Sequence, residues 1–287
     1  AEVVLHQGAV DIGQGSNTVM CQIAAEVLGI NPEQIRLIGA DTGVTPDAGK
    51  TSASRQTVVS GQAVKRAAEA LRAKILALRN AGASARMTFE SGVVVISDKN
   101  RDWTVDFQAM EPDAFGYAVT GEATYDPPTT ALDADGQGQP YAVYGYGAHL
   151  AEVSVDMQLG TVRVLRMSAA HDVGQVINPM LAEGQVEGGI AQGLGMALME
   201  EYQAGQTDNL HDYLIPTTGD MPDITTHLIE CPDPEGPFGA KGLGEHALIP
   251  TTPAILNAIR HATGARLTQL PARPDRVLAA IKATGQR

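Results

Sequence analysis

The chain has 287 residues, of which 44% are hydrophobic and 18% are charged, and this composition is typical of a folded globular protein. Its formal net charge of −13 argues against nucleic acid or an anionic membrane as a partner. Cys21 and Cys231 are too few for a disulfide framework, a cysteine-ligated zinc site or an iron–sulfur cluster, and we expect a cytoplasmic location. We expect neither a signal peptide nor a membrane span. Because Ala1 leads directly into a strand pattern, we expect a piece of a longer polypeptide.

The first polar turn lies between a strand pattern at residues 2–12 and a helix pattern at residues 19–28. It holds Gly13, Gln14 and Gly15. A strand, a glycine turn and a helix in succession present free backbone N–H groups to an anion. The turn therefore predicts either a phosphate or pyrophosphate cradle or an ordinary strand–helix connection, because a lone Gly-x-Gly is a weak signal.

A second polar turn separates a short strand at residues 35–38 from a long helix that is predicted to start near Thr57. The turn consists of Ser52, Ala53, Ser54, Arg55 and Gln56. Hydroxyl, guanidinium and amide groups at a helix N-terminus suit a polar, anionic ligand. Helix capping beside a surface arginine is the alternative interpretation.

The middle of the chain predicts short strands and then a boundary. The strands are expected at residues 87–90, 93–96 and 103–107. Residues 126–140 are rich in Pro, Asp and Gly, which is typical of a linker or a long surface loop. We therefore divide the chain into a first lobe, residues 1–135, and a second lobe, residues 136–287.

The second lobe opens with a predicted β-hairpin, formed by residues 141–156 and 161–170. His171 and Asp172 follow it. A histidine beside an aspartate is suited to acid–base chemistry, but a hydrogen-bonded turn is the more usual role. No second histidine or carboxylate lies at a metal-ligand spacing, so the sequence predicts no protein-ligated metal.

Asn178-Pro179 then begins a predicted helix that runs to about Tyr202 and is unusually rich in glycine. Its glycines are Gly184, Gly188, Gly189, Gly193 and Gly195. Each costs about 1 kcal/mol relative to alanine in a helix interior, so something is expected to approach the helix closely, either another helix or a cofactor. Gln185 and Gln192 offer polar side chains to such a ligand.

After extended segments at residues 211–216 and 224–230, the chain enters a glycine-rich loop from Glu235 to Glu245. Glycines let a backbone turn sharply and let a ligand approach. The loop therefore predicts one carboxylate aimed at a bound molecule, or else a tight surface turn with an incidental glutamate. A helix from Pro253, a strand piece at residues 266–270 and a helix at residues 274–283 are predicted to follow it.

Five motifs, in this order along the chain, resemble the molybdenum-binding part of the xanthine oxidase family of molybdenum hydroxylases. They are Asp11-Ile-Gly-Gln-Gly15, Ser52-Ala-Ser-Arg-Gln56, His171-Asp-Val-Gly174, Gly184-Gln-Val-Glu-Gly188 and Gly239-Ala-Lys-Gly-Leu-Gly-Glu245. The resemblance extends nearly from end to end. It implies an α+β fold, with mixed sheets and packed helices, that forms the C-terminal part of a molybdopterin-binding region.

The resemblance also implies roles for single residues. Glu245 matches the catalytic glutamate, which takes a proton from a molybdenum-bound hydroxyl or water. The residues implied to hold the cofactor are Gly13, Gln14, Gly15, Ser52, Ala53, Ser54, Arg55, Gln56, Gln185, Lys241, Gly242, Leu243 and Gly244. The amino-acid sequence around the first two motifs is most similar to bacterial aldehyde oxidoreductases. This resemblance implies that the cofactor is molybdopterin cytosine dinucleotide. Its dithiolene sulfurs hold the molybdenum, so protein metal ligands are not expected.

The implied function is oxidation of aldehydes to carboxylic acids with water as the oxygen source. The alternatives are a hydroxylase of aromatic N-heterocycles, such as nicotinate or purines, a non-catalytic cofactor-holding subunit, and a plain nucleotide-binding module. The family's upstream Gly-Phe segment and substrate arginine have no match here. We therefore expect the rest of the molybdenum domain, and [2Fe–2S] clusters, on a missing part of the polypeptide or on a partner subunit. The full assembly is expected to be a homo-oligomer.

Overall fold

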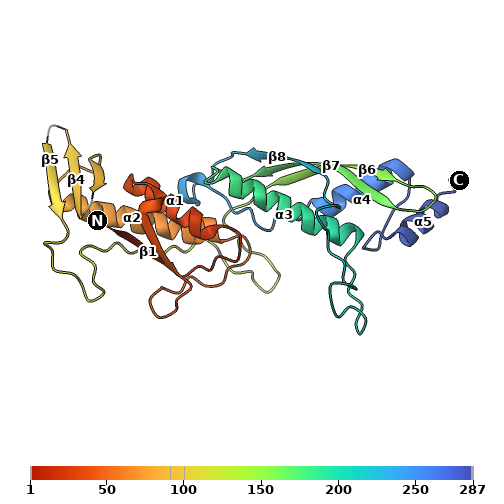
Figure 1. Cartoon of the computed structure of the whole chain (residues 1–287), viewed down its shortest axis with the longest axis horizontal. Helices are drawn as coiled ribbons and strands as arrows, with labels where there is room; N and C mark the ends of the chain where they lie inside the picture. The colour runs from red at the N-terminus through yellow and green to blue at the C-terminus, as the bar shows by residue number, and fades with distance from the viewer. Residues whose placement is uncertain (1, 91, 100, 286–287) are drawn as a thin grey trace. The chain divides into compact units, whose positions relative to one another are not determined.

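The computed structural model describes residues 2–90, 92–99 and 101–285, and it has the mixed α+β fold that the sequence predicts (Figure 1). Contacts divide the chain into two compact units. The first comprises Ala1–Tyr144 with Pro232–Gly242, and the second comprises Gly145–Cys231 with Leu243–Arg287. The predicted lobes met at residue 135, and the second lobe held the whole glycine loop, whereas most of that loop belongs to the first unit.

The first unit begins with two parallel strands connected by a helix. The elements are β1 (Val3–Gln7), α1 (Ser16–Leu28), a 3-10 turn (Pro32–Gln34) and β2 (Ile35–Gly39). The strand predicted over residues 2–12 ends at Gln7, and the chain passes Pro46 at Gly8. A Cβ at Gly8 would lie 1.8 Å from the carbonyl oxygen of Pro46, so only glycine allows this close passage.

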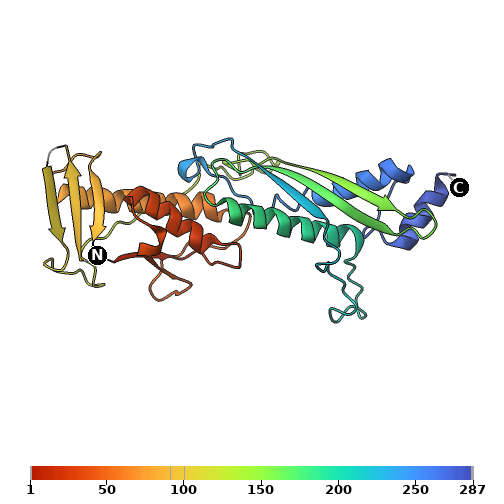
Figure 2. The same ribbon diagram turned by 45° about the horizontal axis from the view of Figure 1, so that its top comes forward.

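Helix α2 (Gly61–Ala77) packs along α1, as Figures 1 and 2 both show. Buried apolar side chains recur along both helices at helical spacing. On α1, Ile23 and Ala24 lie three and four residues after Met20, and on α2, Ala68 lies four residues after Val64 and Ile75 seven residues after Ala68. A Cβ at Gly61 would lie 2.9 Å from the Ile23 side chain. Gln56–Ser60, just before α2, is a π-helical turn where a regular α-helix was predicted. Such wide turns occur frequently at functional sites.

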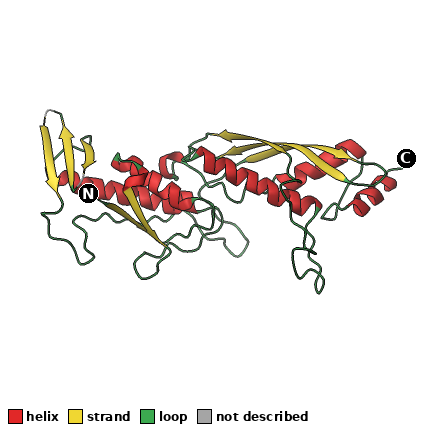
Figure 3. Ribbon diagram, viewed as in Figure 1, coloured by secondary structure: helices red, strands yellow, loops and turns green. Residues whose placement is uncertain are grey.

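The three short strands predicted in the middle of the chain form an antiparallel meander (Figure 3). They are β3 (Arg86–Glu90), β4 (Val93–Asp98) and β5 (Arg101–Asp106). Val94 and Ile96 of the central strand are fully buried. Residues 107–146, all of which are described, contain no helix or strand and include the predicted linker.

The second unit consists of a three-stranded sheet and the helices packed on it (Figure 2). Its elements are β6 (Gly147–Val155), β7 (Val162–Asp172), α3 (Pro179–Leu198), β8 (Asp223–Ile229), α4 (Thr251–Thr263) and α5 (Pro274–Ala283). A 3-10 turn between β8 and α4 (Pro237–Gly239) belongs to the first unit. The predicted hairpin of β6 and β7 is confirmed, and β8 adds to β7 in parallel. Met167, Ile190 and Ile255 are fully buried where β7, α3 and α4 meet.

Several predicted details of the second unit are wrong. His171 and Asp172 end β7 instead of forming a turn, because they pair with Gly147 of β6 and Ile229 of β8. Residues 211–216 and 266–270 form no strand, and α3 ends at Leu198. Within the described residues, no helix combines the length and the apolar character needed to span a bilayer.

Candidate functional site

The first glycine turn is organised by the carboxylate of Asp11. This carboxylate accepts N–H groups from Gly13 at 2.8 Å, Gly15 at 3.3 Å and Asn17 at 3.0 Å. Burial would raise the pKa of Asp11, but these backbone hydrogen bonds hold it below its ordinary value. The expectation of free amides at Gly13 and Gly15 is therefore wrong, because an aspartate of the same turn already occupies them.

Gln14 also stabilises this turn. Its Oε1 accepts the Ile12 N–H at 2.7 Å, and its Nε2 donates to Ser16 Oγ at 3.1 Å. Gly13 has φ +104°, and a Cβ built on it meets nothing within 4 Å. The turn is thus held from within, and the space beside Gly13 is open to a ligand.

The second polar turn is conformationally strained. Ala53 and Ser54 have φ values of 56° and 53°, in the left-handed region that residues with a Cβ seldom adopt. Each costs about 1–3 kcal/mol, and such strain gathers at binding sites. Gly242 packs directly on this turn, because a Cβ on it would lie 2.1 Å from the Ser54 carbonyl oxygen. The structure therefore brings together two predicted cofactor-binding segments that are far apart in sequence.

Two polar side chains of the second turn stabilise the turn itself. Arg55 Nη1 donates to the carbonyl oxygens of Ala48 at 2.8 Å and Lys50 at 3.3 Å. Gln56 is buried, and its Nε2 donates to Thr51 Oγ1 at 2.9 Å. Arg55 and Gln56 thus fix the shape of the turn.

Ser52 leaves a polar group available in the same turn. Its Oγ is buried and has no hydrogen-bond partner within the described residues. A buried hydroxyl without a hydrogen-bond partner destabilises the fold, and a polar ligand atom could supply the missing hydrogen bond. Together with the strain at Ala53 and Ser54, this atom makes the second turn a candidate site for a polar ligand.

The segment Pro232–Gly242 is anchored to the first unit along its length. Tyr125 donates its hydroxyl to Glu235 at 2.6 Å, and burial, reinforced by this bond, raises the pKa of Tyr125 to about 12. Lys65 lies 5.5 Å from the ring centre of Phe238. Lys241 is 9% exposed. These contacts explain why the first part of the glycine loop belongs to the first unit.

The remaining predicted site residues lie in the second unit. Glu245 is exposed, and its carbonyl oxygen accepts the N–H of Leu248 at 3.2 Å, so it begins a turn. Leu243 packs against the core of this unit. Gln185 is half-buried on α3, one helical turn before Gly189. A Cβ on Gly189 would lie 2.8 Å from Ala247, so α3 touches the chain two residues after Glu245.

The glycines of α3 serve two purposes. Gly189 and Gly193 approach Ala247 and Thr251, which confirms close packing of α3 against α4 and the chain before it. A Cβ on Gly184 or Gly188 meets nothing within 4 Å. These two glycines lie one turn apart, so they leave one stripe of α3 open beside Gln185.

A cluster of His149, His171 and His246, which we call the histidine stack, was not predicted from the sequence; His171 is fully buried and the other two histidines are half-buried. His149 Nε2 lies 2.7 Å from His171 Nε2, and His171 Nδ1 lies 3.3 Å from His246 Nδ1. Thr251 Oγ1 lies 3.0 Å from His149 Nδ1. No motif spacing indicates this cluster, because it forms only when β6 pairs with β7. Among the described residues, no group of three or more His, Cys, Asp or Glu side chains is arranged to hold a metal ion.

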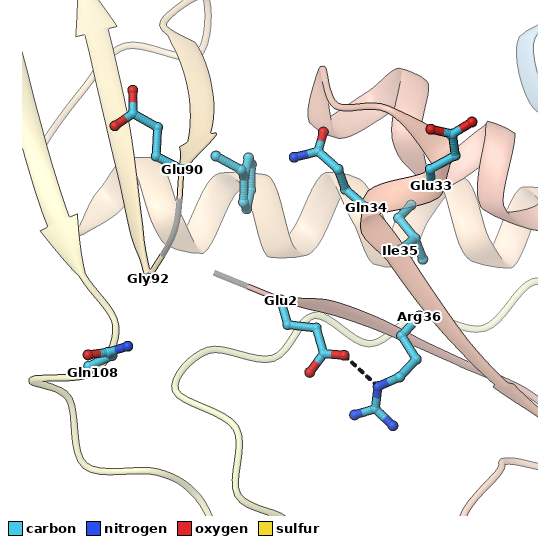
Figure 4. Close-up of a pocket in the computed structure, with 9 residues that line it drawn as sticks. Glu2, Glu33, Gln34, Ile35, Arg36, Glu90, Gly92 and Gln108 are labelled. Carbon is cyan, nitrogen blue, oxygen red and sulfur yellow. Dashed lines mark hydrogen bonds and ion pairs between the residues drawn. The ribbon is translucent and has the colours of Figure 1, made fainter.

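The first unit also has a pocket that is separate from the predicted residues (Figure 4). Its lining is Glu2, Glu33, Gln34, Ile35, Arg36, Phe89, Glu90, Gly92 and Gln108. Glu2 and Arg36 form an exposed ion pair at 2.7 Å across it. None of the predicted cofactor-binding residues lines this pocket.

Comparison with known proteins identifies the family of this chain. Residues 1–222 match the model of the molybdopterin cofactor-binding domain. The chain belongs to this family. The aldehyde oxidoreductase of Megalodesulfovibrio gigas is 34% identical over 289 residues, covering 98% of this cofactor-binding chain and 29% of that protein. The putative xanthine dehydrogenase molybdenum-binding subunit XdhA of Escherichia coli K12 is 32% identical over 292 residues, covering 95% of this chain and 37% of that protein.

The fold of this molybdopterin cofactor-binding chain is also similar to solved structures. The aldehyde oxidoreductase from Desulfovibrio desulfuricans matches with a TM-score of 0.82 and 34% identity, over 97% of this chain and 29% of the other. The predicted membership of the xanthine oxidase family is confirmed, as is the α+β fold. The chain spans 29–37% of the length of these relatives.

Proposed function

We propose that this chain is part of a molybdenum hydroxylase that oxidises aldehydes to carboxylic acids with water as the oxygen source, and that Glu245 is its general base. The observation that carries the proposal is the glycine loop itself. Gly242 packs against the strained turn at Ser54, and the exposed carboxylate of Glu245 follows three residues later in the chain. The membership of the molybdopterin-binding family supplies the cofactor that such a loop would serve.

The residues of the first unit would hold the cofactor. The buried Ser52 hydroxyl would bind a polar cofactor atom, while Arg55 and Gln56 keep the turn in shape. The open space beside Gly13 would admit the nucleotide portion, which we propose to be cytosine dinucleotide. In the second unit, Gln185 and the open stripe at Gly184 would face the pterin.

The bound molybdenum cofactor would supply the redox chemistry and the activated oxygen. The carboxylate of Glu245 would be the proton acceptor for this chemistry, which is general-base catalysis. The carbonyl oxygen of Glu245 is tied to the Leu248 N–H, so the backbone that carries the base is held in a turn. Orientation of this kind is a large part of what a protein adds to cofactor chemistry.

The rest of the enzyme would come from outside this chain. The chain spans about a third of its relatives, and one of them is itself named a subunit. We therefore propose that the remaining molybdenum domain and [2Fe–2S] clusters reside on the missing polypeptide or a partner subunit, in a homo-oligomeric assembly located in the cytoplasm.

A hydroxylase of aromatic N-heterocycles is the alternative. The similarity to a putative xanthine dehydrogenase subunit favours it, at 32% identity against 34% for the aldehyde oxidoreductase. A difference this small does not select a substrate. Turnover of benzaldehyde, nicotinate and xanthine by the purified complete enzyme would separate the two functions.

The test of the base is Glu245→Gln in the complete enzyme, with Glu183→Gln on the exposed surface of α3 as the matched control. We expect Glu245→Gln to retain molybdenum and a released cytosine nucleotide, measured by elemental analysis and after acid treatment, and to lose turnover by about 10²-fold or more. Normal turnover in Glu245→Gln would refute the base assignment. Absence of molybdenum and nucleotide from the freshly purified wild-type enzyme would refute the proposed function.

A further inference from the structure

The histidine stack joins four separate parts of the second unit. His149 belongs to β6, His171 to the end of β7, His246 to the loop after Glu245, and Thr251 to the start of α4. Neighbouring rings stand edge to face, with centroids 4.9 Å and 5.0 Å apart. His171, in the middle, has no exposed surface. The residue that follows Glu245 is therefore tied to the sheet and the helix by imidazole rings.

The glycines before and within β6 make room for this arrangement. A Cβ on Gly147 would lie 2.7 Å from two atoms of the His171 ring, and a Cβ on Gly145 would lie 3.2 Å from the His246 ring. The backbone thus approaches the His171 ring more closely than a side chain at Gly147 would allow, and it leaves only tight space for one at Gly145. The stack is consequently a tightly enclosed structure, with little freedom for the rings to turn.

We propose that the histidine stack positions the loop that carries Glu245. Its three neutral imidazoles form a chain in which the tautomer of each ring determines that of the next, and the Thr251 hydroxyl is the last hydrogen-bonding group of the chain. This inference rests on the proposed role of Glu245 as the base. His149, His171, His246 and Thr251 are positioning residues in it. Only Glu245 touches the reacting groups.

The hydrogen bonds of the stack link the three tautomers. A neutral imidazole carries one N–H and one bare nitrogen, so a bond between two rings requires one of each. If His149 Nε2 donates to His171 Nε2, then His171 Nδ1 must donate to His246 Nδ1, and the Thr251 hydroxyl must donate to His149 Nδ1. If His246 donates instead, every bond reverses, and His149 donates to Thr251. A protonated ring would donate from both nitrogens, so the direction of one bond would no longer determine the direction of the next.

The surroundings favour the neutral forms. Burial lowers the pKa of His149 to about 4, and burial together with the neighbouring His246 and His149 lowers the pKa of His171 to about 4, against an ordinary value of 6.5. The titratable groups next in the chain are Asp172 and Glu245. The carboxylate of Asp172 accepts the Gly174 N–H at 3.1 Å. At neutral pH His149 and His171 are therefore uncharged, and their tautomers stay linked.

Thr251 provides a mild test, because valine has nearly the same shape and lacks only the hydroxyl. In the complete enzyme, Thr251→Val should lower kcat on the order of tenfold, since small misplacements of a catalytic group have large effects on rate. KM and molybdenum content should not change. Thr251→Ser, which keeps the hydroxyl, should restore kcat. His227 is an exposed residue of β8 in the same sheet. His227→Gln is therefore the control and should behave as wild type.

A second readout reports on the rings themselves. Exchange of the histidine C2 hydrogen for deuterium, measured by mass spectrometry as a function of pH, reports the protonation of each histidine in the holoenzyme. We expect His149 and His171 of the wild type to titrate well below pH 6.5, and the exchange profile of His246 to change in Thr251→Val but not in Thr251→Ser. The wild-type measurement does not depend on whether a variant folds.

The outcomes separate this inference from the proposed function. Normal kcat and normal His246 exchange in Thr251→Val would overturn the inference, and an inactive Glu245→Gln would still support the base. Titration of His149 and His171 near pH 6.5 would also overturn it, as would equal loss of kcat in Thr251→Val and Thr251→Ser. An active Glu245→Gln would remove the base role, and the positioning of that base would be overturned with it.

Discussion

The contact between Gly242 and the Ser54 turn gives the sharpest prediction from this structure. In Gly242→Ala, the added Cβ would lie 2.1 Å from the Ser54 carbonyl oxygen and 3.1 Å from the carbonyl carbon and Cβ of the same residue. Carbon and oxygen normally meet no closer than about 3.2 Å, so the overlap is roughly 1 Å against backbone. The turn at Ala53 and Ser54 is already strained and cannot yield without changing its left-handed conformation.

Overpacking of this kind typically costs about 1–3 kcal/mol, and a clash with backbone belongs at the upper end of that range. For a unit of this size, each kcal/mol shifts Tm by about 2–4 °C, so Gly242→Ala should lower Tm by about 4–10 °C. Because Ser52 and Ser54 belong to the proposed cofactor site, the molybdenum content of the purified enzyme should fall as well. Differential scanning calorimetry and elemental analysis measure the two effects.

Gly219→Ala is the control with the same added methyl group. A Cβ at Gly219 would lie 3.7 Å from its nearest neighbour, Thr217 Oγ1, which is an ordinary contact, so the Tm and the molybdenum content of the enzyme should stay at the wild-type values. If Gly242→Ala keeps the wild-type Tm and a full molybdenum content, the close approach at Ser54 is not a feature of the native protein, and the reasoning fails.

Two further predictions concern stability. Tyr125→Phe removes the 2.6 Å hydrogen bond to Glu235 and should lower the free energy of unfolding by about 1–2 kcal/mol in urea. Tyr202→Phe, at an exposed tyrosine, is the control and should change it by less than about 0.5 kcal/mol. Acidification from pH 6.5 to pH 4 should destabilise the second unit: His149 and His171 have a lower pKa when folded, so the unfolded chain binds more protons across this window. A Tm that does not fall between these pH values, measured on the chain with His171 intact, would contradict the buried neutral histidines.

Local signals predicted many of the elements. Asn178 accepts the Leu181 N–H at 3.0 Å and caps α3, as the Asn-Pro pair indicated. Helix α5 has the predicted bounds, Pro274–Ala283, because proline begins it and its apolar periodicity is regular. The β3–β5 meander followed from short apolar runs separated by turns. In each case neighbouring residues in the chain determine the structure.

The features that the sequence did not reveal depend on partners distant in the chain. β8 pairs in parallel with β7 only after some 50 intervening residues, so no local signal showed that His171 ends a strand. The histidine stack needs that pairing and the loop at His246 together. The role of Asp11, in contrast, could have been predicted from neighbouring residues. An aspartate two residues before a glycine commonly forms an Asx turn, and that signal would have shown that the Gly13 amide was occupied.

The path of the chain through the two units has a consequence for how the protein is made and dissected. Pro232–Gly242 completes the first unit, yet it is synthesised after Gly145–Cys231, which belongs to the second. A ribosome that has just released Tyr144 from its exit tunnel has therefore not yet supplied the glycine that seats against Ser54 or the carboxylate that receives the Tyr125 hydroxyl. Cutting the gene after Tyr144 would yield an unfinished fragment. To be produced alone, the first unit would instead need an artificial linker that joins Tyr144 to Pro232, with the chain ending at Gly242.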